Sequence, residues 1–216
     1  MGGKDPYSGS KGAAEIVFGA YARSFFTAPN SCRVGTVRAG NVIGGGDFAV
    51  DRIIPDCVRA WKNREAVVIR APKSVRPWQH VLEPLSGYLW FAAKLYGDTS
   101  EKFQNQGFNF GPSRESQRTV EELLLEIKKS WHEGEWKIDP SQVGNKKEAV
   151  LLSLNCEKAK RELQWQSLLE FSDTAKWTAD WYRAWTQGQD VAKLTRDQIQ
   201  KYAQIAASQK IAWAGK

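Results

Sequence analysis

Cysteine is scarce in this sequence, and the three that occur are widely separated. Cys32, Cys57 and Cys156 form no CxxC pair and are too few for a disulfide framework. Their scarcity argues against a structural zinc or dithiol redox motif and fits a protein of the reducing cytoplasm. We therefore expect no metal site and a cytoplasmic location.

Long apolar runs are also absent. No stretch reaches the roughly 18 apolar residues that a membrane-spanning helix needs, and the first residues lack the apolar core of a signal peptide. Hydrophobic residues nevertheless make up 42% and charged residues 25% of the 216 positions, which is typical of a globular protein. The sequence therefore predicts one large or two small domains and no membrane partner.

Acidic side chains are outnumbered by basic ones. The chain has 31 Lys and Arg against 24 Asp and Glu, a net charge of +7, and this balance favours an anionic partner. Residues 52–76 hold seven basic and two acidic side chains, so this segment alone carries +5. It contains no lysine- or arginine-rich run of the kind that binds nucleic acid. We therefore expect a compact phosphate site and no nucleic-acid partner, with a solvated basic face as the alternative.

Apolar periodicity predicts alternating helices and strands, which is typical of an α/β protein. Helices are expected over 5–26, 51–63, 85–96, 119–131, 157–163, 172–185 and 195–207, and strands over 34–43, 67–70, 107–110 and 151–154. The apolar positions of helix 5–26 fall on one face. The carboxy-terminal tail is expected to be unanchored.

Two local patterns refine this prediction. Thr119 and Glu122 form a capping box at the start of helix 119–131. Trp177, Trp181 and Trp185 stand four residues apart, which favours a helix face packed on a core over a stacking platform for bases or sugars.

The segment Asp5-Pro6-Tyr7-Ser8-Gly9-Ser10-Lys11 carries the most informative chemistry. Tyr7 and Lys11 are four residues apart, so on a helix they share one face. Because an ammonium close to a phenol stabilises the phenolate, the pair can move a proton on or off a sugar hydroxyl. Alone the spacing is not specific, since it occurs by chance in many helices.

Four further motifs follow this helix in order: RAGNVIGGGD at 38–47, DRIIPD at 51–56, RPWQHVLE at 76–83 and FNFGP at 108–112. This order resembles the extended short-chain dehydrogenase/reductase family, which acts on nucleotide-linked sugars. The residues within the motifs are similar to those of the 4,6-dehydratase branch of that family. The resemblance implies CDP-glucose or a related nucleotide sugar as partner and NAD as cofactor. It implies oxidation at C4 of the sugar, loss of water across C5 and C6, and return of hydride to C6.

The resemblance also implies an architecture. The fold class would be α/β: the carboxy-terminal portion of a Rossmann-like doubly wound domain plus a smaller mixed α/β substrate-binding domain. Residues 1–46 and 78–112 would belong to the NAD-binding domain, residues 47–77 and 113–190 to the nucleotide-sugar domain, and residues 191–216 to a final helix and tail. A homodimer of the full-length enzyme would form through a four-helix bundle that includes helix 5–26.

Site roles follow from the same resemblance. Tyr7 would be the catalytic base, and Lys11 would bind the nicotinamide ribose and activate Tyr7. The segment beneath the nicotinamide would contain Arg38, Ala39, Gly40 and Val42. The nucleotide sugar would be bound by Asn41, Arg52, Arg76, Asn109 and Glu148. Arginine suits the phosphate positions because its guanidinium fork matches phosphate oxygens, although a single exposed arginine is more often solvated, and His80 is expected to be structural.

One part of a dinucleotide fold is missing from the sequence: the glycine-rich turn that holds the pyrophosphate at a helix N-terminus. Gly44-Gly45-Gly46 follows the Tyr7/Lys11 helix and lacks the GxGxxG spacing. At about 30 residues per strand–helix–strand step, roughly 130–150 residues of such an enzyme would precede Met1, which resembles an internal methionine of the family. The hypothesis is a carboxy-terminal part that, when isolated, exposes apolar surface, aggregates, retains no NAD and is inactive.

Three other interpretations stay open. The chain could derive from another enzyme of the family, such as a nucleotide-sugar 4-epimerase. It could be a non-catalytic sugar-nucleotide-binding remnant that has lost the cofactor half. A nucleic-acid-binding protein is indicated only by the net charge, and such binding would fade as salt rises.

Overall fold

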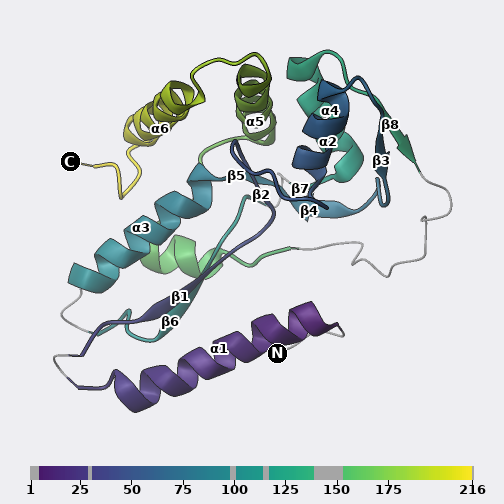
Figure 1. Cartoon of the computed structure of the whole chain (residues 1–216). Helices are drawn as coiled ribbons and strands as arrows, with labels where there is room; N and C mark the ends of the chain where they lie inside the picture. The colour runs from purple at the N-terminus through teal and green to yellow at the C-terminus, as the bar shows by residue number, and fades with distance from the viewer. Residues whose placement is uncertain (1–4, 29–30, 98–100, 114–116, 139–152, 216) are drawn as a thin grey trace.

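The computed structural model describes residues 5–28, 31–97, 101–113, 117–138 and 153–215. Its strands form four two-stranded pairs (Figure 1). Three pairs are parallel: β1 (Gly35–Ala39) with β6 (Gln106–Phe110), β2 (Val42–Ile43) with β5 (Gln79–His80), and β3 (Val67–Ile69) with β8 (Trp136–Ile138). The fourth, β4 (Val75–Pro77) with β7 (Gln117–Thr119), is antiparallel. The expected α/β class with parallel strands is confirmed.

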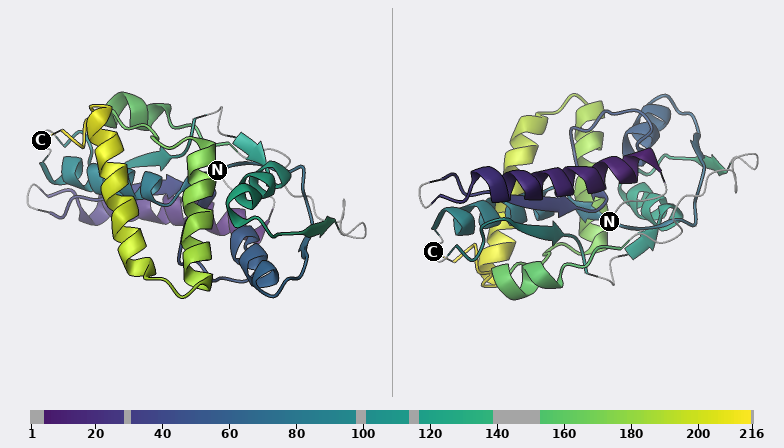
Figure 2. Two further views of the ribbon diagram at one scale, coloured as in Figure 1. Left: turned by 90° about the horizontal axis from the view of Figure 1, so that it is seen from above. Right: turned by 90° about the horizontal axis from the view of Figure 1, so that it is seen from below.

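Helix α1 (Pro6–Phe25) begins where the sequence predicts. Asp5 caps it by accepting a 3.0 Å hydrogen bond from the Ser8 amide, and Pro6 occupies the first turn. The helix lies along one side of the β1–β6 pair, while α3 (Leu82–Gly97) lies on the other (Figures 1 and 2). The exposed apolar surface that the sequence predicts for this chain is seen on α1, where Val17 and Phe25 are 54% and 67% exposed.

The strand expected over 34–43 is divided in two. Gly40 and Asn41 separate β1 from β2, and the two strands pair with different partners. A Cβ on Gly40 would lie 3.0 Å from Cγ of Pro77 and 3.2 Å from Cδ1 of Leu154. A side chain at position 40 would therefore require Pro77 or Leu154 to shift by a few tenths of an ångström.

Three groups of buried side chains hold the elements together. The first joins α2 (Ile53–Lys62), α4 (Val120–Trp131) and α5 (Phe171–Thr186), with Trp61, Leu123 and Tyr182 at its centre. The second packs α3 on β1 and β6 through Phe91 and Phe108. The third packs α6 (Val191–Ser208) against α5 and the tail, through Tyr202, Trp177 and Ile211.

The tryptophans of α5 take the packing role that the sequence indicates. Trp177 and Trp181 are buried, at 5% and 8% exposure. Trp185 is partly buried and packs against the first group of core residues. Of the helices in the described part of the chain, none is long and apolar enough to cross a bilayer.

Several predicted boundaries need correction. Residues 153–154 are not in a strand, and 151–152 lie outside the described residues. The predicted helix over 157–163 is π-helical over Ala159–Leu163. Helix α6 begins at Val191, earlier than the expected residue 195, because Asp190 caps it by accepting from the Lys193 amide.

The expectation of an unanchored tail is also wrong. Ile211 is buried at 7% exposure. Trp213 stacks on Tyr202 of α6, with ring centroids 5.8 Å apart and planes inclined by 14°. The tail therefore contributes to the core that holds α6.

Candidate functional site

The site starts with Tyr7 and Lys11 on the first half of α1. The Lys11 Nζ lies 5.7 Å from the centroid of the Tyr7 ring, as the four-residue spacing requires. Tyr7 is 71% exposed, so its hydroxyl is accessible to a ligand. Both groups lie on the helix that runs beside β1 and β6 (Figure 1).

Glu15 continues the face that Tyr7 and Lys11 begin, one helical turn further on. Its Oε2 lies 2.6 Å from Nη1 of Arg38 and accepts a 3.1 Å hydrogen bond from Oγ1 of Thr36. These contacts attach α1 to β1. Sequence reasoning missed Glu15, although the spacing of Tyr7, Lys11 and Glu15 was the signal that could have found it.

Arg38 and Asn109 are brought into direct contact. They are register partners on the parallel strands β1 and β6, and the Arg38 Nε donates a 2.8 Å hydrogen bond to Oδ1 of Asn109. The Asn109 Nδ2 in turn donates to the backbone oxygen of Asn155 at 3.0 Å. One chain of contacts thus links α1, β1, β6 and the segment that begins at residue 153.

The segment from Ala39 to Val42 lies at the carboxyl end of β1. Ligands of open α/β sheets bind outside the carboxyl ends of the strands, so this segment lies where a cofactor or substrate is expected. The Asn41 oxygen accepts a 3.0 Å hydrogen bond from the Gln79 amide, which fixes the backbone but leaves the Asn41 amide group out of that contact. Val42 is exposed.

The two predicted phosphate ligands lie on other elements. Arg52 is exposed and occupies the N-cap position of α2, where its side chain makes no capping hydrogen bond. Arg76 lies on β4, and its Nη1 donates to the backbone oxygen of Val75 at 2.9 Å. Its register partner on antiparallel β7 is Arg118, which sequence reasoning missed. Glu148 lies outside the described residues.

A buried titratable group, His80, lies between Arg76 and Asn109 in the sequence. His80 is 1% exposed, and burial lowers its pKa to about 4, so the imidazole is neutral at neutral pH. Its Nδ1 accepts a 3.3 Å hydrogen bond from the Leu82 amide, and its ring meets that of Trp177 edge-on. These contacts agree with the structural role expected for His80.

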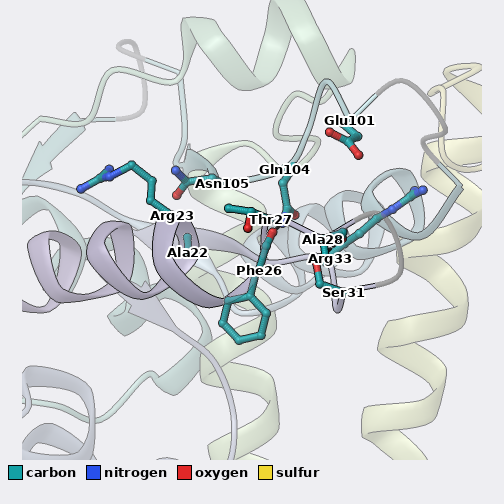
Figure 3. A pocket seen from close by; sticks show the side chains of 10 residues that line it. All are labelled: Ala22, Arg23, Phe26, Thr27, Ala28, Ser31, Arg33, Glu101, Gln104 and Asn105. Atoms are coloured by element: carbon teal, nitrogen blue, oxygen red, sulfur yellow. Dashed lines mark hydrogen bonds between the residues drawn. The ribbon is translucent and has the colours of Figure 1, made fainter.

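A pocket of about 240 Å³ lies elsewhere (Figure 3). It is lined by the end of α1 and the segments that lead into β1 and β6, including Arg23, Phe26, Arg33 and Gln104. It therefore lies at the amino ends of β1 and β6, opposite to the predicted site, and contains none of the predicted site residues. Within the described residues, no cluster of three or more His, Cys, Asp or Glu side chains could hold a metal ion.

The sequence of this chain is related to that of a known enzyme. No protein-family model matches the chain. The chain is 44% identical over 207 residues to CDP-glucose 4,6-dehydratase of Salmonella typhimurium, and the match covers 94% of this chain and 56% of that enzyme. The resemblance that the sequence motifs indicated is therefore confirmed over the part of that enzyme that the chain spans.

Solved structures give the same fold. UDP-glucose 4-epimerase from Stenotrophomonas maltophila, with bound NAD and formylated UDP-arabinopyranose, aligns with a TM-score of 0.69 at 17% identity, over 85% of this chain and 56% of that chain. dTDP-glucose 4,6-dehydratase from Bacillus anthracis, in complex with NAD, aligns with a TM-score of 0.63 at 19% identity, over 88% and 55%. The fold is thus that of the Rossmann-like epimerases and dehydratases, and the chain spans just over half the length of these relatives.

Proposed function

We propose that this chain carries the Tyr/Lys pair and the nucleotide-sugar-binding portion of an NAD-dependent CDP-glucose 4,6-dehydratase, a hydro-lyase. The observation that supports this most strongly is the 44% identity over 207 residues. The exposed Tyr7 and Lys11 on one face of α1 supply the acid–base group that the reaction needs.

Tyr7 and Lys11 have different roles in this reaction. Tyr7 accepts the proton of the sugar's C4 hydroxyl as that carbon is oxidised, and Lys11 favours the phenolate through its charge. NAD, when bound, supplies the acceptor that takes hydride from C4 and returns it to C6. Between these steps one water is lost across C5 and C6, so the product is CDP-4-keto-6-deoxyglucose and no second redox substrate is consumed.

The nucleotide-sugar diphosphate needs cationic ligands, which Arg52 and Arg76 would supply. Asn41 would contact the sugar or diphosphate, and Glu148 the nucleoside. Asn109 uses its amide group to hold Arg38 and the Asn155 carbonyl. One N–H and one lone pair remain on that amide for a ligand.

The residues present fit one end of NAD and not the other. Tyr7 and Lys11 are exposed on α1, the helix that runs beside β1 (Figure 1). They would hold the nicotinamide ribose, with Arg38, Ala39, Gly40 and Val42 beneath the ring. The glycine-rich turn for the pyrophosphate is absent from the 216 residues. The proposed activity therefore needs a pyrophosphate-binding segment beyond these residues, and the 216-residue chain alone should not turn over.

We extend the proposal to architecture. Residues 1–46 and 78–112 would complete the NAD-binding domain, residues 47–77 and 113–190 would bind the nucleotide sugar, and residues 191–216 would brace the fold. The exposed apolar side chains of α1, including Val17, Tyr21 and Phe25, would be covered in a homodimer of the complete enzyme.

A chimaera tests the function directly. The part of the Salmonella enzyme that this chain does not span is joined to residues 1–216, and CDP-glucose turnover is followed by the mass loss of one water. We expect conversion to the 4-keto-6-deoxy product, and we expect Tyr7→Phe to lower kcat by about 10²–10⁴-fold. Tyr21→Phe, which changes another exposed tyrosine of α1, should leave kcat unchanged.

Two outcomes would overturn the proposal. A chimaera that inverts C4 without losing water would be an epimerase, which the fold similarity also allows. A chimaera that binds CDP and NAD but releases no product would favour a non-catalytic remnant. If Tyr7→Phe and Tyr21→Phe both lost activity, the loss would come from damage to α1 and not from removal of the base.

A further inference from the structure

The loop between β2 and α2 is held in an unusual way. It runs from Gly44 to Arg52 and leaves the carboxyl end of a parallel strand, the location at which α/β proteins bind ligands. Gly46 and Asp51 have positive φ angles of 88° and 61°, so the loop turns sharply at both of these points. Its last residue, Arg52, is one of the two proposed phosphate ligands.

Three successive backbone oxygens of this loop accept hydrogen bonds from side chains of other elements. The Tyr182 hydroxyl, on α5, donates to the Asp47 oxygen at 2.5 Å. Arg59, on α2, donates from Nη1 to the Phe48 oxygen at 3.0 Å and from Nη2 to the Ala49 oxygen at 3.3 Å. A side-chain donor on each of three consecutive carbonyls leaves the loop backbone little freedom.

Aromatic packing fixes the same loop from the side of α5. The Phe48 ring meets the Tyr182 ring edge-on at 6.0 Å and lies 4.8 Å from the Trp185 ring. Gly45 lies against the Trp181 indole so closely that a Cβ there would overlap it. Burial and the nearby Asp47 raise the pKa of Tyr182 to about 12, so its hydroxyl keeps its proton at neutral pH.

We propose that Tyr182 and Arg59 are positioning residues for nucleotide-sugar binding: they hold the carbonyls of residues 47–49 and thereby set where Arg52 presents its guanidinium to the diphosphate. Neither residue need touch the ligand. The inference rests on the proposed role of Arg52 in phosphate binding. It adds two residues, distant in sequence from each other, that the motifs do not mark.

Calorimetric binding of CDP to the chimaera described above, in which residues 1–216 are joined to the segment of the Salmonella enzyme that they do not span, tests this inference. We expect Tyr182→Phe, which keeps the ring and removes the hydroxyl, to weaken CDP binding on the order of fivefold to tenfold. The matched control is Tyr202→Phe, which removes a buried tyrosine hydroxyl that donates to Glu83 at 2.8 Å. The control should lower thermal stability and leave the affinity for CDP unchanged.

A double-mutant cycle separates positioning from general damage. If Tyr182 acts through Arg52, Tyr182→Phe should weaken CDP binding in the native background and have no further effect in an Arg52→Ala background. Its effect on thermal stability should be the same in both backgrounds. Arg59→Lys keeps the charge but cannot donate to both the Phe48 and Ala49 oxygens as the guanidinium does. It gives the same test if Tyr182→Phe does not fold.

The outcomes are distinct. Failure of the chimaera without these substitutions to bind CDP would overturn the proposed phosphate site itself. Native binding with an unchanged affinity in Tyr182→Phe and Arg59→Lys would overturn the positioning role alone. An equal loss with and without Arg52 would do the same, because the effect would not pass through that side chain.

Discussion

Glu83 gives the sharpest prediction about stability. It is 1% exposed at the start of α3, and its carboxyl group accepts three hydrogen bonds. Oε1 accepts from the amides of Leu168 and Leu169 at 2.9 and 2.7 Å, and Oε2 accepts from the Tyr202 hydroxyl at 2.8 Å. Burial outweighs these three donors and raises the pKa of Glu83 from 4.5 to about 7.

The sign of the pH dependence follows from this raised pKa. The folded protein binds the Glu83 proton more tightly than the unfolded chain does, so folding is favoured where the carboxyl is protonated. The contribution of Glu83 to the free energy of unfolding should therefore fall as pH rises from about 4.5 to about 7 and stay low above it. With about 1.4 kcal/mol per pKa unit, the loss over this interval is about 3 kcal/mol.

Urea unfolding between pH 5 and pH 8 measures this loss. Glu83→Gln keeps an oxygen for the two amides and cannot ionise, so its stability should lack the decrease that the native chain shows. Glu133→Gln, at an exposed position after α4, should retain the native pH dependence. Parallel pH profiles for the native chain and Glu83→Gln would refute the argument that burial sets the ionisation of Glu83.

Two further predictions concern packing. Gly45→Ala should lower the free energy of unfolding by about 1–3 kcal/mol, because its Cβ would overlap the Trp181 indole. Gly97→Ala, whose Cβ would have nothing within 4 Å, should not lower it. Equal melting temperatures for the two variants would contradict this prediction. Trp213→Ala should cost about 1–3 kcal/mol by removing the partly buried ring stacked on Tyr202, and thermal melting that matches the native chain would show that the tail is dispensable.

The local signals in the sequence predicted the helices well. Asp5 with Pro6, and Thr119 with Glu122, mark helix starts through contacts within a single turn, and such contacts do not depend on the rest of the fold. The spacing of Tyr7 and Lys11 likewise placed them on one face of α1. These features could be predicted because each is decided by residues close together in sequence.

Features decided by distant residues were missed. The stacking of Trp213 on Tyr202 needs the return of the tail onto α6, which no pattern in the tail itself shows. The break at Gly40 lies against Pro77, more than thirty residues later. The apolar periodicity of α1 shows only that an apolar face exists, and not whether the described chain contains a surface to cover it.

Several basic side chains in the segment over residues 52–76 make contacts within the fold. Arg59 binds loop carbonyls and pairs with Asp56, and Arg70 pairs with Asp51 at 2.7 Å. Lys62 lies 4.5 Å from the centroid of the Trp185 ring. Since these three cations hold α2 and the loop that precedes it, the segment is not a continuous basic face of the kind that tracks a nucleic-acid backbone. A compact diphosphate ligand needs only a few guanidinium groups, and the cations engaged in the fold are those that fix the loop ending at Arg52.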